Sequence, residues 1–313
     1  MATISPNKKI NAGYKKIIIS NPVGGNLSIS IWYPSADNEK TYTYNTAANQ
    51  IPITGKVAFN GSIAAKNYPW IVFSHGFSGS GIGSVEICEA LARNGYIVAS
   101  PDHSDAVQCA RIEGFSSGNL KAAIQHLKNN PFNNGTKYLY RIAEIKTVID
   151  HLHTNDFFSV HPENLILGGH SMGGWTVLKA LENNYHPKAM FFFSMGELNW
   201  LFQQQRYFDA SFFQSLNFPT AYFYGAKEHK QAIAAKRENV YAAFCYSNSP
   251  SPSYGLIVPR GNHFSYNSKA LAPQLSGNKN QNNVIERRLI NFLDKHIKGK
   301  KVNVSNHPLD VSK

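Results

Sequence analysis

The sequence LILGGHSMGG at residues 165–174 decides how the rest of the chain is interpreted. Its apolar first half predicts a short buried strand, and its second half opens a segment that predicts a helix, with Ser171 at the turn between them. Such a turn strains the backbone and crowds its neighbours, so Gly169 and Gly173 remove the side chains that would clash there. We expect the Ser171 hydroxyl to project above the sheet, where the helix N-terminus behind it favours negative charge.

Strands and helices alternate along the chain after residue 70, which predicts an α/β fold. The sheet should be mostly parallel and covered by helices on both faces. Two more strands precede it and are joined by a turn that contains Pro22. The expected strands are 14–20, 26–33, 70–73, 96–100, 164–167, 189–194, 220–224 and 254–258. The expected helices are 86–94, about 120–128, 138–153, 175–182, 230–243 and 284–298.

No internal repeat or interdomain linker is visible, so residues 1–313 are expected to form a single domain. Residues 37–66 are polar with little periodicity and predict a long excursion, in which short strands are possible. The aromatic-rich residues 196–216 predict either a lid or acyl pocket, or ordinary core packing. Residues 299–313 are expected to form a polar tail.

The net charge of +12 is compatible with a nucleic-acid partner or an anionic membrane surface. No helix-turn-helix, zinc-finger or RNP pattern is present, so we expect no nucleic-acid partner. The densest basic run, residues 295–301, ends the last expected helix. Its cations either complement the helix dipole or provide a weak contact with anionic lipid.

The three cysteines are far apart and form no Cys-x-x-Cys pair, so the sequence predicts neither a zinc site nor a disulfide framework. The first nine residues lack an apolar signal-peptide core, and no apolar run reaches the length of a transmembrane helix. The sequence therefore predicts a cytoplasmic protein without a metal or cofactor. Secretion stays open if a leader precedes the sequence, and the oligomeric state is not predicted.

A serine nucleophile needs a histidine that removes its proton. Of the histidines that follow Ser171, His186 precedes a strand, and His296 lies in the last helix. His263 follows the last expected strand in the loop PRGNHFS, and a loop at the carboxyl edge of a strand faces ligands. We therefore predict that His263 is the base.

The base needs a carboxylate that orients it, and two candidates follow neighbouring strands. Glu228 follows the strand 220–224 in GAKEH, and Glu197 follows the strand 189–194 in SMGE. Glu228 is the favoured acid and Glu197 is the alternative.

Two backbone amides should stabilise the negative oxygen of the tetrahedral intermediate. One belongs to Met172, directly after the serine. The other belongs to Phe77, in the motif SHGF after the strand 70–73. We expect His75 of this motif to brace the loop rather than to act as a base.

Several segments together resemble the α/β-hydrolase superfamily, over about residues 14–298. More narrowly, the chain is similar to the predicted dienelactone hydrolase and platelet-activating-factor acetylhydrolase-like group. Cutinase-type polyester hydrolases share the Gly-Phe loop and the GHSMGG turn. The matching segments are IWYP 31–34, VFSHGF 72–77, PDH 101–103, Tyr140-Arg141 ahead of Ile149-Asp150, GHSMGG 169–174, and GAKEH 225–229, which is similar to a Gly-x-x-Asp acid segment.

The resemblance implies an α/β-hydrolase fold and a lipase-like serine esterase acting on a small-molecule or lipid ester. The sequence departs from the group in two places. The acid is Glu rather than Asp, and Ser171 replaces the Cys of true dienelactone hydrolase, so dienelactone chemistry is not implied. The leading hypothesis is ester hydrolysis through an acyl-enzyme. The alternatives are a phospholipid acyl hydrolase, a polyester hydrolase, and a non-catalytic binding protein with the same fold.

Overall fold

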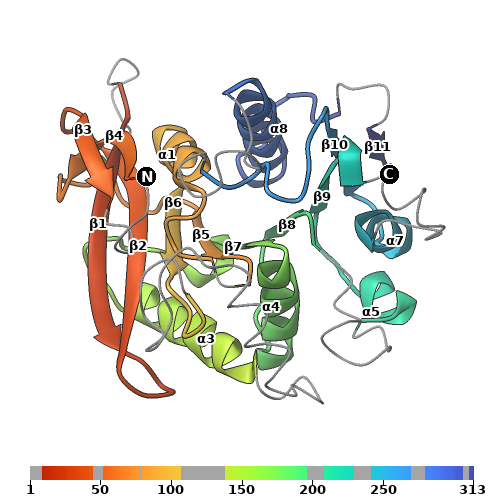
Figure 1. Ribbon diagram of the computed structural model, residues 1–313, viewed down its shortest axis with the longest axis horizontal. Coiled ribbons are helices and arrows are strands. Elements are labelled where there is room, and N and C mark those ends of the chain that lie inside the picture. Colours follow the sequence, from red (N-terminus) through yellow and green to blue (C-terminus); the bar gives the residue numbers. More distant parts are fainter. Residues whose placement is uncertain are drawn as a thin grey trace.

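The computed structural model describes residues 9–44, 52–77, 79–106, 138–195, 208–228, 241–268, 279–305 and 310–313. Within these ranges, eleven strands form one sheet in the order β11-β10-β9-β8-β7-β5-β6-β2-β1-β4-β3 (Figure 1). The strands are β1 (Asn11–Ser20), β2 (Asn26–Ser35), β3 (Lys40–Tyr44), β4 (Ile53–Phe59), β5 (Trp70–Ser74), β6 (Ile97–Pro101), β7 (Leu165–His170), β8 (Ala189–Phe193), β9 (Thr220–Gly225), β10 (Ser253–Val258) and β11 (Val311–Ser312).

The centre of the sheet is parallel, as the sequence predicts. Strands β6, β5, β7, β8, β9 and β10 pair in parallel with one another, whereas β2 joins β6 and β11 joins β10 in antiparallel orientation. All residues of these six central strands are buried, because helices cover both faces of the sheet. Parallel strands place their carboxyl ends at one edge of the sheet, and the turn that carries Ser171 follows β7 at that edge.

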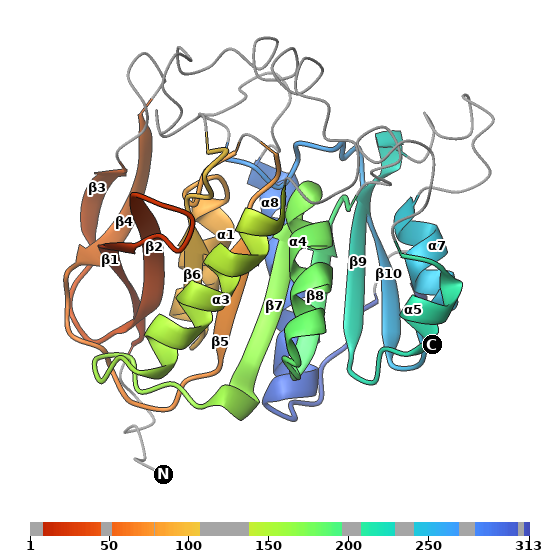
Figure 2. The same ribbon diagram turned by 90° about the horizontal axis from the view of Figure 1, so that it is seen from below.

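Helices cover the two faces of the sheet, with α1 and α8 on one face and α3, α4, α5 and α7 on the other (Figures 1 and 2). The helices are α1 (Val85–Arg93), α3 (Leu139–His153), α4 (Met172–Ala180), α5 (Ala210–Gln214), α7 (Tyr241–Asn248) and α8 (Lys279–Ile297), with short 3-10 turns η3 (Pro162–Asn164) and η4 (Leu181–Asn183). Strand residues alternate between two core layers: Leu165 and Leu167 face α3, and Ile166 faces the layer of α8. The predicted α/β architecture is thereby confirmed.

The polar segment 37–66 extends the sheet. Its strands β3 and β4 form an antiparallel pair, and β4 also pairs with β1. Tyr44 anchors this extension, since its hydroxyl accepts a hydrogen bond from Trp32 Nε1 (2.9 Å) and donates one to Glu89 (2.9 Å). Aromatic residues in an otherwise polar sequence thus give the segment a buried side.

The last residues of the predicted polar tail pair with the rest of the domain. Val311 and Ser312 form β11 against β10, and Asp310 pairs with the buried Arg288 at 2.9 Å. Within the basic run, Lys298 and Lys300 both pair with Asp294. Lipid contact by this run stays a prediction.

Most of the helix predicted at 230–243 lies outside the described residues, and its last three residues are the first three of α7. The structure has α7 at Tyr241–Asn248, and residues 229–240 lie outside the described ranges. The helix continues past residue 243 because Cys245 is buried in the core layer that contains Tyr222. In the aromatic-rich segment, residues 196–207 lie outside the described residues. Phe208 and Phe213 are buried in the core, which agrees with core packing at these two positions. No helix in the described part of the chain has the length and apolar character needed to cross a bilayer.

Candidate active site

Ser171 occupies a strained turn between β7 and α4. Its φ and ψ angles are 53° and −119°, a conformation that residues with a side chain rarely adopt. The turn is tight because α4 begins directly against its neighbours. A Cβ on Gly169 would lie 2.3 Å from the carbonyl carbon of Gly173, and one on Gly173 would lie 1.9 Å from the backbone oxygen of Ser74. Only glycine fits at these two positions, and this packing holds Ser171 in place.

His263 lies in the loop that follows β10 and reaches Ser171. Its Nε2 is 2.8 Å from Ser171 Oγ. The His263 side chain is 36% exposed, so a substrate can reach it. The side chain of His170, the residue before the serine, donates from Nε2 to the backbone oxygen of His263 at 2.7 Å. Burial and the neighbouring His263 lower the pKa of His170 to about 3, so His170 is neutral and serves as a structural donor.

Glu228 follows β9 and faces the other nitrogen of the same imidazole. Its Oε1 is 3.1 Å from His263 Nδ1, and its Oε2 accepts hydrogen bonds from Ser194 Oγ (2.6 Å) and from the Gly225 amide (2.7 Å). Burial raises the pKa of this carboxyl. The hydrogen bond and charge of His263 and the two other donors outweigh burial, and the net pKa is lowered. Glu228 is therefore an ionised carboxylate.

Glu197, the alternative acid, lies outside the described residues. Ser194 and His170 were not predicted as site residues. Ser194 could have been found because it directly follows β8, at the same edge of the sheet as Glu228. Its φ of 41° is a second strained backbone conformation at this edge.

The loop after β5 packs against the turn that carries Ser171. A Cβ on Gly76 would lie 3.3 Å from Ser171 Cβ, so the residue before Phe77 packs directly on the turn. The Met172 amide is the first in α4 and has no intrahelical acceptor. Neither the Phe77 amide nor the Met172 amide donates to another described residue. These two amides are the candidates for the predicted oxyanion donors.

A second Ser-His-Glu set lies behind this loop. Ser74 Oγ is 2.8 Å from His103 Nε2, and His103 Nδ1 is 2.8 Å from Glu144 Oε2. The His103 and Glu144 side chains are fully buried, and burial lowers the pKa of His103. No substrate can reach this set, which joins β5, the loop after β6 and helix α3.

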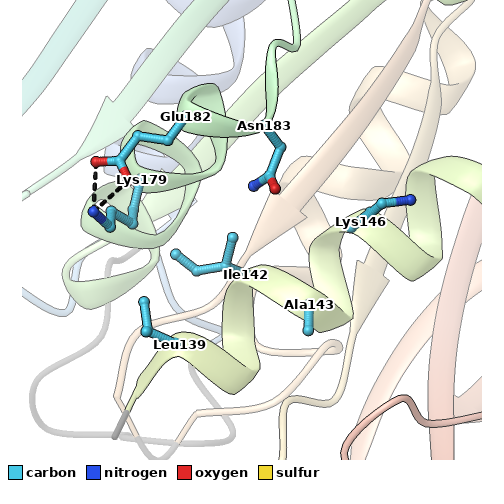
Figure 3. Close-up of a pocket in the computed structure, with 7 residues that line it drawn as sticks. All are labelled: Leu139, Ile142, Ala143, Lys146, Lys179, Glu182 and Asn183. Atoms are coloured by element: carbon cyan, nitrogen blue, oxygen red, sulfur yellow. Dashed lines mark hydrogen bonds and ion pairs between the residues drawn. The ribbon is translucent and has the colours of Figure 1, made fainter. Parts of the chain in front are cut away.

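The structure also has a surface pocket of about 400 Å³ between α3 and the end of α4 (Figure 3). It is lined by Leu139, Ile142, Ala143, Lys146, Lys179, Glu182 and Asn183. Lys179 pairs with Glu182, and Lys146 pairs with Asp150 outside the lining. The pocket contains neither Ser171 nor its partners. Among the described residues, no three His, Cys, Asp or Glu side chains are arranged to hold a metal ion.

Comparison with known proteins agrees with this architecture. Residues 38–114 match the family model of platelet-activating factor acetylhydrolase, isoform II, a segment that includes the loop with Phe77. No curated protein sequence matches the chain significantly. Among solved structures, a ferulic acid esterase from Streptomyces cinnamoneus is similar, with 16% identity, a TM-score of 0.64, and coverage of 98% of this chain and 95% of that one. This similarity over nearly the whole of both chains shows that the chain has an α/β-hydrolase fold.

Proposed function

We propose that the chain is a serine hydrolase that cleaves carboxylic esters. The observation that carries the proposal is the exposed link from Ser171 Oγ through the His263 imidazole to the ionised Glu228, with distances of 2.8 and 3.1 Å. A serine hydroxyl is a weak nucleophile at neutral pH unless an adjacent base removes its proton. The base in turn needs a group that fixes its tautomer, and Glu228 supplies it.

The reaction would proceed through an acyl-enzyme. Ser171 Oγ attacks the ester carbonyl carbon while its proton passes to His263 Nε2. The carbonyl oxygen becomes negative and accepts hydrogen bonds from the Phe77 and Met172 amides. When the tetrahedral intermediate collapses, the C–O bond to the alcohol breaks and His263 protonates the leaving oxygen.

A water molecule completes the cycle. His263 removes its proton as the oxygen attacks the acyl carbon. When the second tetrahedral intermediate collapses, the bond between the acyl carbon and Ser171 Oγ breaks, the acid leaves, and His263 gives the proton to Ser171 Oγ. Glu228 keeps its charge throughout and stabilises the imidazolium. These steps balance without a metal or cofactor.

The choice of an ester over an amide or another electrophile has support from the comparisons. The matched family is named for an acetylhydrolase, and the similar structure for an esterase. The family match favours a phospholipid with a short acyl chain as a second, narrower candidate substrate. A simple ester is the broader proposal, and a polyester remains a third class to test.

Labelling and turnover together test the proposal. Wild-type protein should react with a fluorophosphonate at Ser171, located by peptide mapping, and should hydrolyse p-nitrophenyl esters. Ser171→Ala should lose both activities while its circular dichroism spectrum is unchanged. Ser249→Ala, which removes a buried serine bonded to Tyr222, is the matched control that keeps both.

A panel of substrates then separates the classes. It should include p-nitrophenyl esters of graded acyl length, a phospholipid with an acetyl group and a polyester film. A folded wild-type protein that is neither labelled nor active on any of them would instead be a non-catalytic binding protein.

A further inference from the structure

Arg141 of α3 is a buried charged residue for which the proposed reaction has no direct use. Its side chain is completely buried, and a buried charge is costly unless it is paired. Asp105, in the loop after β6, pairs with it in bidentate fashion, at 2.9 Å to Nε and 2.6 Å to Nη2. This pairing offsets the charge but leaves N–H groups of the guanidinium for other acceptors.

Those N–H groups point at the loop that carries Phe77. Nη1 donates to the backbone oxygen of His75 at 2.9 Å, and Nη2 donates to the backbone oxygen of Gly76 at 3.2 Å. Nη1 also lies 3.5 Å from Thr176 Oγ1, whose hydroxyl donates to the Met172 carbonyl at 3.1 Å. One side chain thus contacts both segments that supply the candidate oxyanion amides.

His75 holds the same carbonyl from a second direction. Its Nε2 accepts a hydrogen bond from the His103 amide at 3.1 Å, so the ring proton is on Nδ1. Nδ1 then donates to the Gly76 oxygen at 2.7 Å. Burial, with the charge of Arg141, keeps the pKa of His75 well below its ordinary value, so the ring stays neutral. The Gly76 carbonyl therefore has two fixed donors.

The geometry of the peptide bond transfers this restraint to Phe77. The peptide between Gly76 and Phe77 is trans, so its C=O and N–H groups point in opposite directions. Donors that fix the Gly76 oxygen on the α3 side thus direct the Phe77 amide hydrogen away from α3. Hydrogen bonds to the carbonyl also polarise the peptide group and make its N–H a stronger donor.

We propose that Arg141 is a positioning residue for ester hydrolysis, which orients and polarises the Gly76–Phe77 peptide so that the Phe77 amide stabilises the oxyanion. The inference rests on the proposed function. Arg141 does not touch the substrate. Its charge acts through one peptide group inside the protein, where electrostatic interactions are stronger than in water.

Three variants test the role. Arg141→Met removes the charge and the hydrogen bonds. Arg141→Met combined with Asp105→Asn does so without leaving a buried carboxylate unpaired, which protects folding. Arg141→Lys keeps the charge but not the planar array of donors. Arg288→Met is the matched control, since it removes another buried arginine, paired with Asp310, that packs on the opposite face of the sheet.

The readouts separate positioning from simple stability. Active sites are titrated to completion with a fluorophosphonate, and kcat per labelled site is compared with KM for a p-nitrophenyl ester. An alkyl boronic acid, which forms a negatively charged tetrahedral adduct with the serine, reports on the oxyanion site. Loss of an oxyanion donor lowers kcat by about 10²–10³-fold. In both Met variants we expect kcat to fall by about a hundredfold, boronate affinity to fall in parallel, and KM to stay within about threefold of the wild-type value. In Arg141→Lys we expect a smaller loss of kcat.

A purely structural role predicts another pattern, in which melting temperature falls but kcat per labelled site and boronate affinity stay near wild type. We expect that pattern only for Arg288→Met. If the Arg141→Met/Asp105→Asn variant, or Arg141→Lys where that double variant does not fold, keeps wild-type kcat and boronate affinity, the inference is overturned. A wild-type protein that is neither labelled at Ser171 nor active would overturn this inference and the proposed function together, so the two failures are distinguishable.

Discussion

Replacing Glu228 by glutamine keeps the shape of the side chain but changes what it can accept. In the wild type one carboxylate oxygen accepts from Ser194 Oγ and the Gly225 amide, and the other faces His263 Nδ1. In Glu228→Gln, the amide oxygen stays with the Gly225 N–H, because the backbone offers only a donor there. The amide NH₂ group then faces Nδ1 and forces that nitrogen to be an acceptor.

The consequence is the wrong tautomer for a base. With Nδ1 unprotonated, the ring proton moves to Nε2, which faces Ser171 Oγ and can no longer accept its proton. In serine triads, changing the acid to its amide with the geometry intact lowers kcat by about 10⁴, which corresponds to about 5 kcal/mol of transition-state stabilisation. We expect a loss of that order, with little change in melting temperature.

Steady-state hydrolysis of p-nitrophenyl esters, normalised to fluorophosphonate-reactive sites, measures the effect. The comparison variant is Glu228→Asp, which keeps the charge on a shorter side chain and should retain more activity than the glutamine variant. A Glu228→Gln enzyme with activity within tenfold of wild type would refute the reasoning and point to Glu197 as the acid.

Two further changes test the packing around this centre. Ser194→Ala removes a hydrogen bond to the charged Glu228, worth about 1.5–3 kcal/mol of unfolding free energy. Because the folded-state pKa of Glu228 is lowered, this contribution is present above the ordinary glutamate pKa of about 4.3 and is lost as the pH falls through the folded value. Urea unfolding should therefore show the largest difference from wild type near neutrality and a smaller one in acid; a difference that grows in acid would reverse the assigned sign. Gly173→Ala places a Cβ 1.9 Å from the Ser74 backbone oxygen, so α4 must shift. We expect a protein with a lower free energy of unfolding and little esterase activity. A stable and active variant would show that the turn is less tightly packed than described.

The fold could be predicted because the chain repeats one local pattern. Short apolar runs between helical segments predict parallel strands, and the site residues follow such runs directly. Ser171, His263 and Glu228 come after β7, β10 and β9, and the carboxyl ends of these strands share an edge. Chain order and strand position were enough to propose the grouping and to favour Glu228, although Glu197 stayed an alternative acid.

The supporting residues could not be predicted in the same way, because their environment is built from distant segments. Arg141 lies beside an apolar helical stripe, and the sequence shows it only as part of the family-like pair Tyr140-Arg141. The structure buries it against Asp105 and two loop carbonyls. The same is true at the C-terminus, where a polar composition gave no indication that Asp310 pairs with Arg288. Pairings between residues far apart in sequence leave no periodic signal in either segment.

The buried set of Ser74, His103 and Glu144 has a consequence for recognising reactive centres from coordinates. A template built only from interatomic distances would accept this set, since both of its links are 2.8 Å long. It would accept Ser171, His263 and Glu228 on the same grounds. The two sets differ in solvent accessibility, because the His103 side chain is fully buried and the His263 side chain is exposed. A template for this fold must therefore include the solvent exposure of the histidine as well as the interatomic distances in order to identify a catalytic triad.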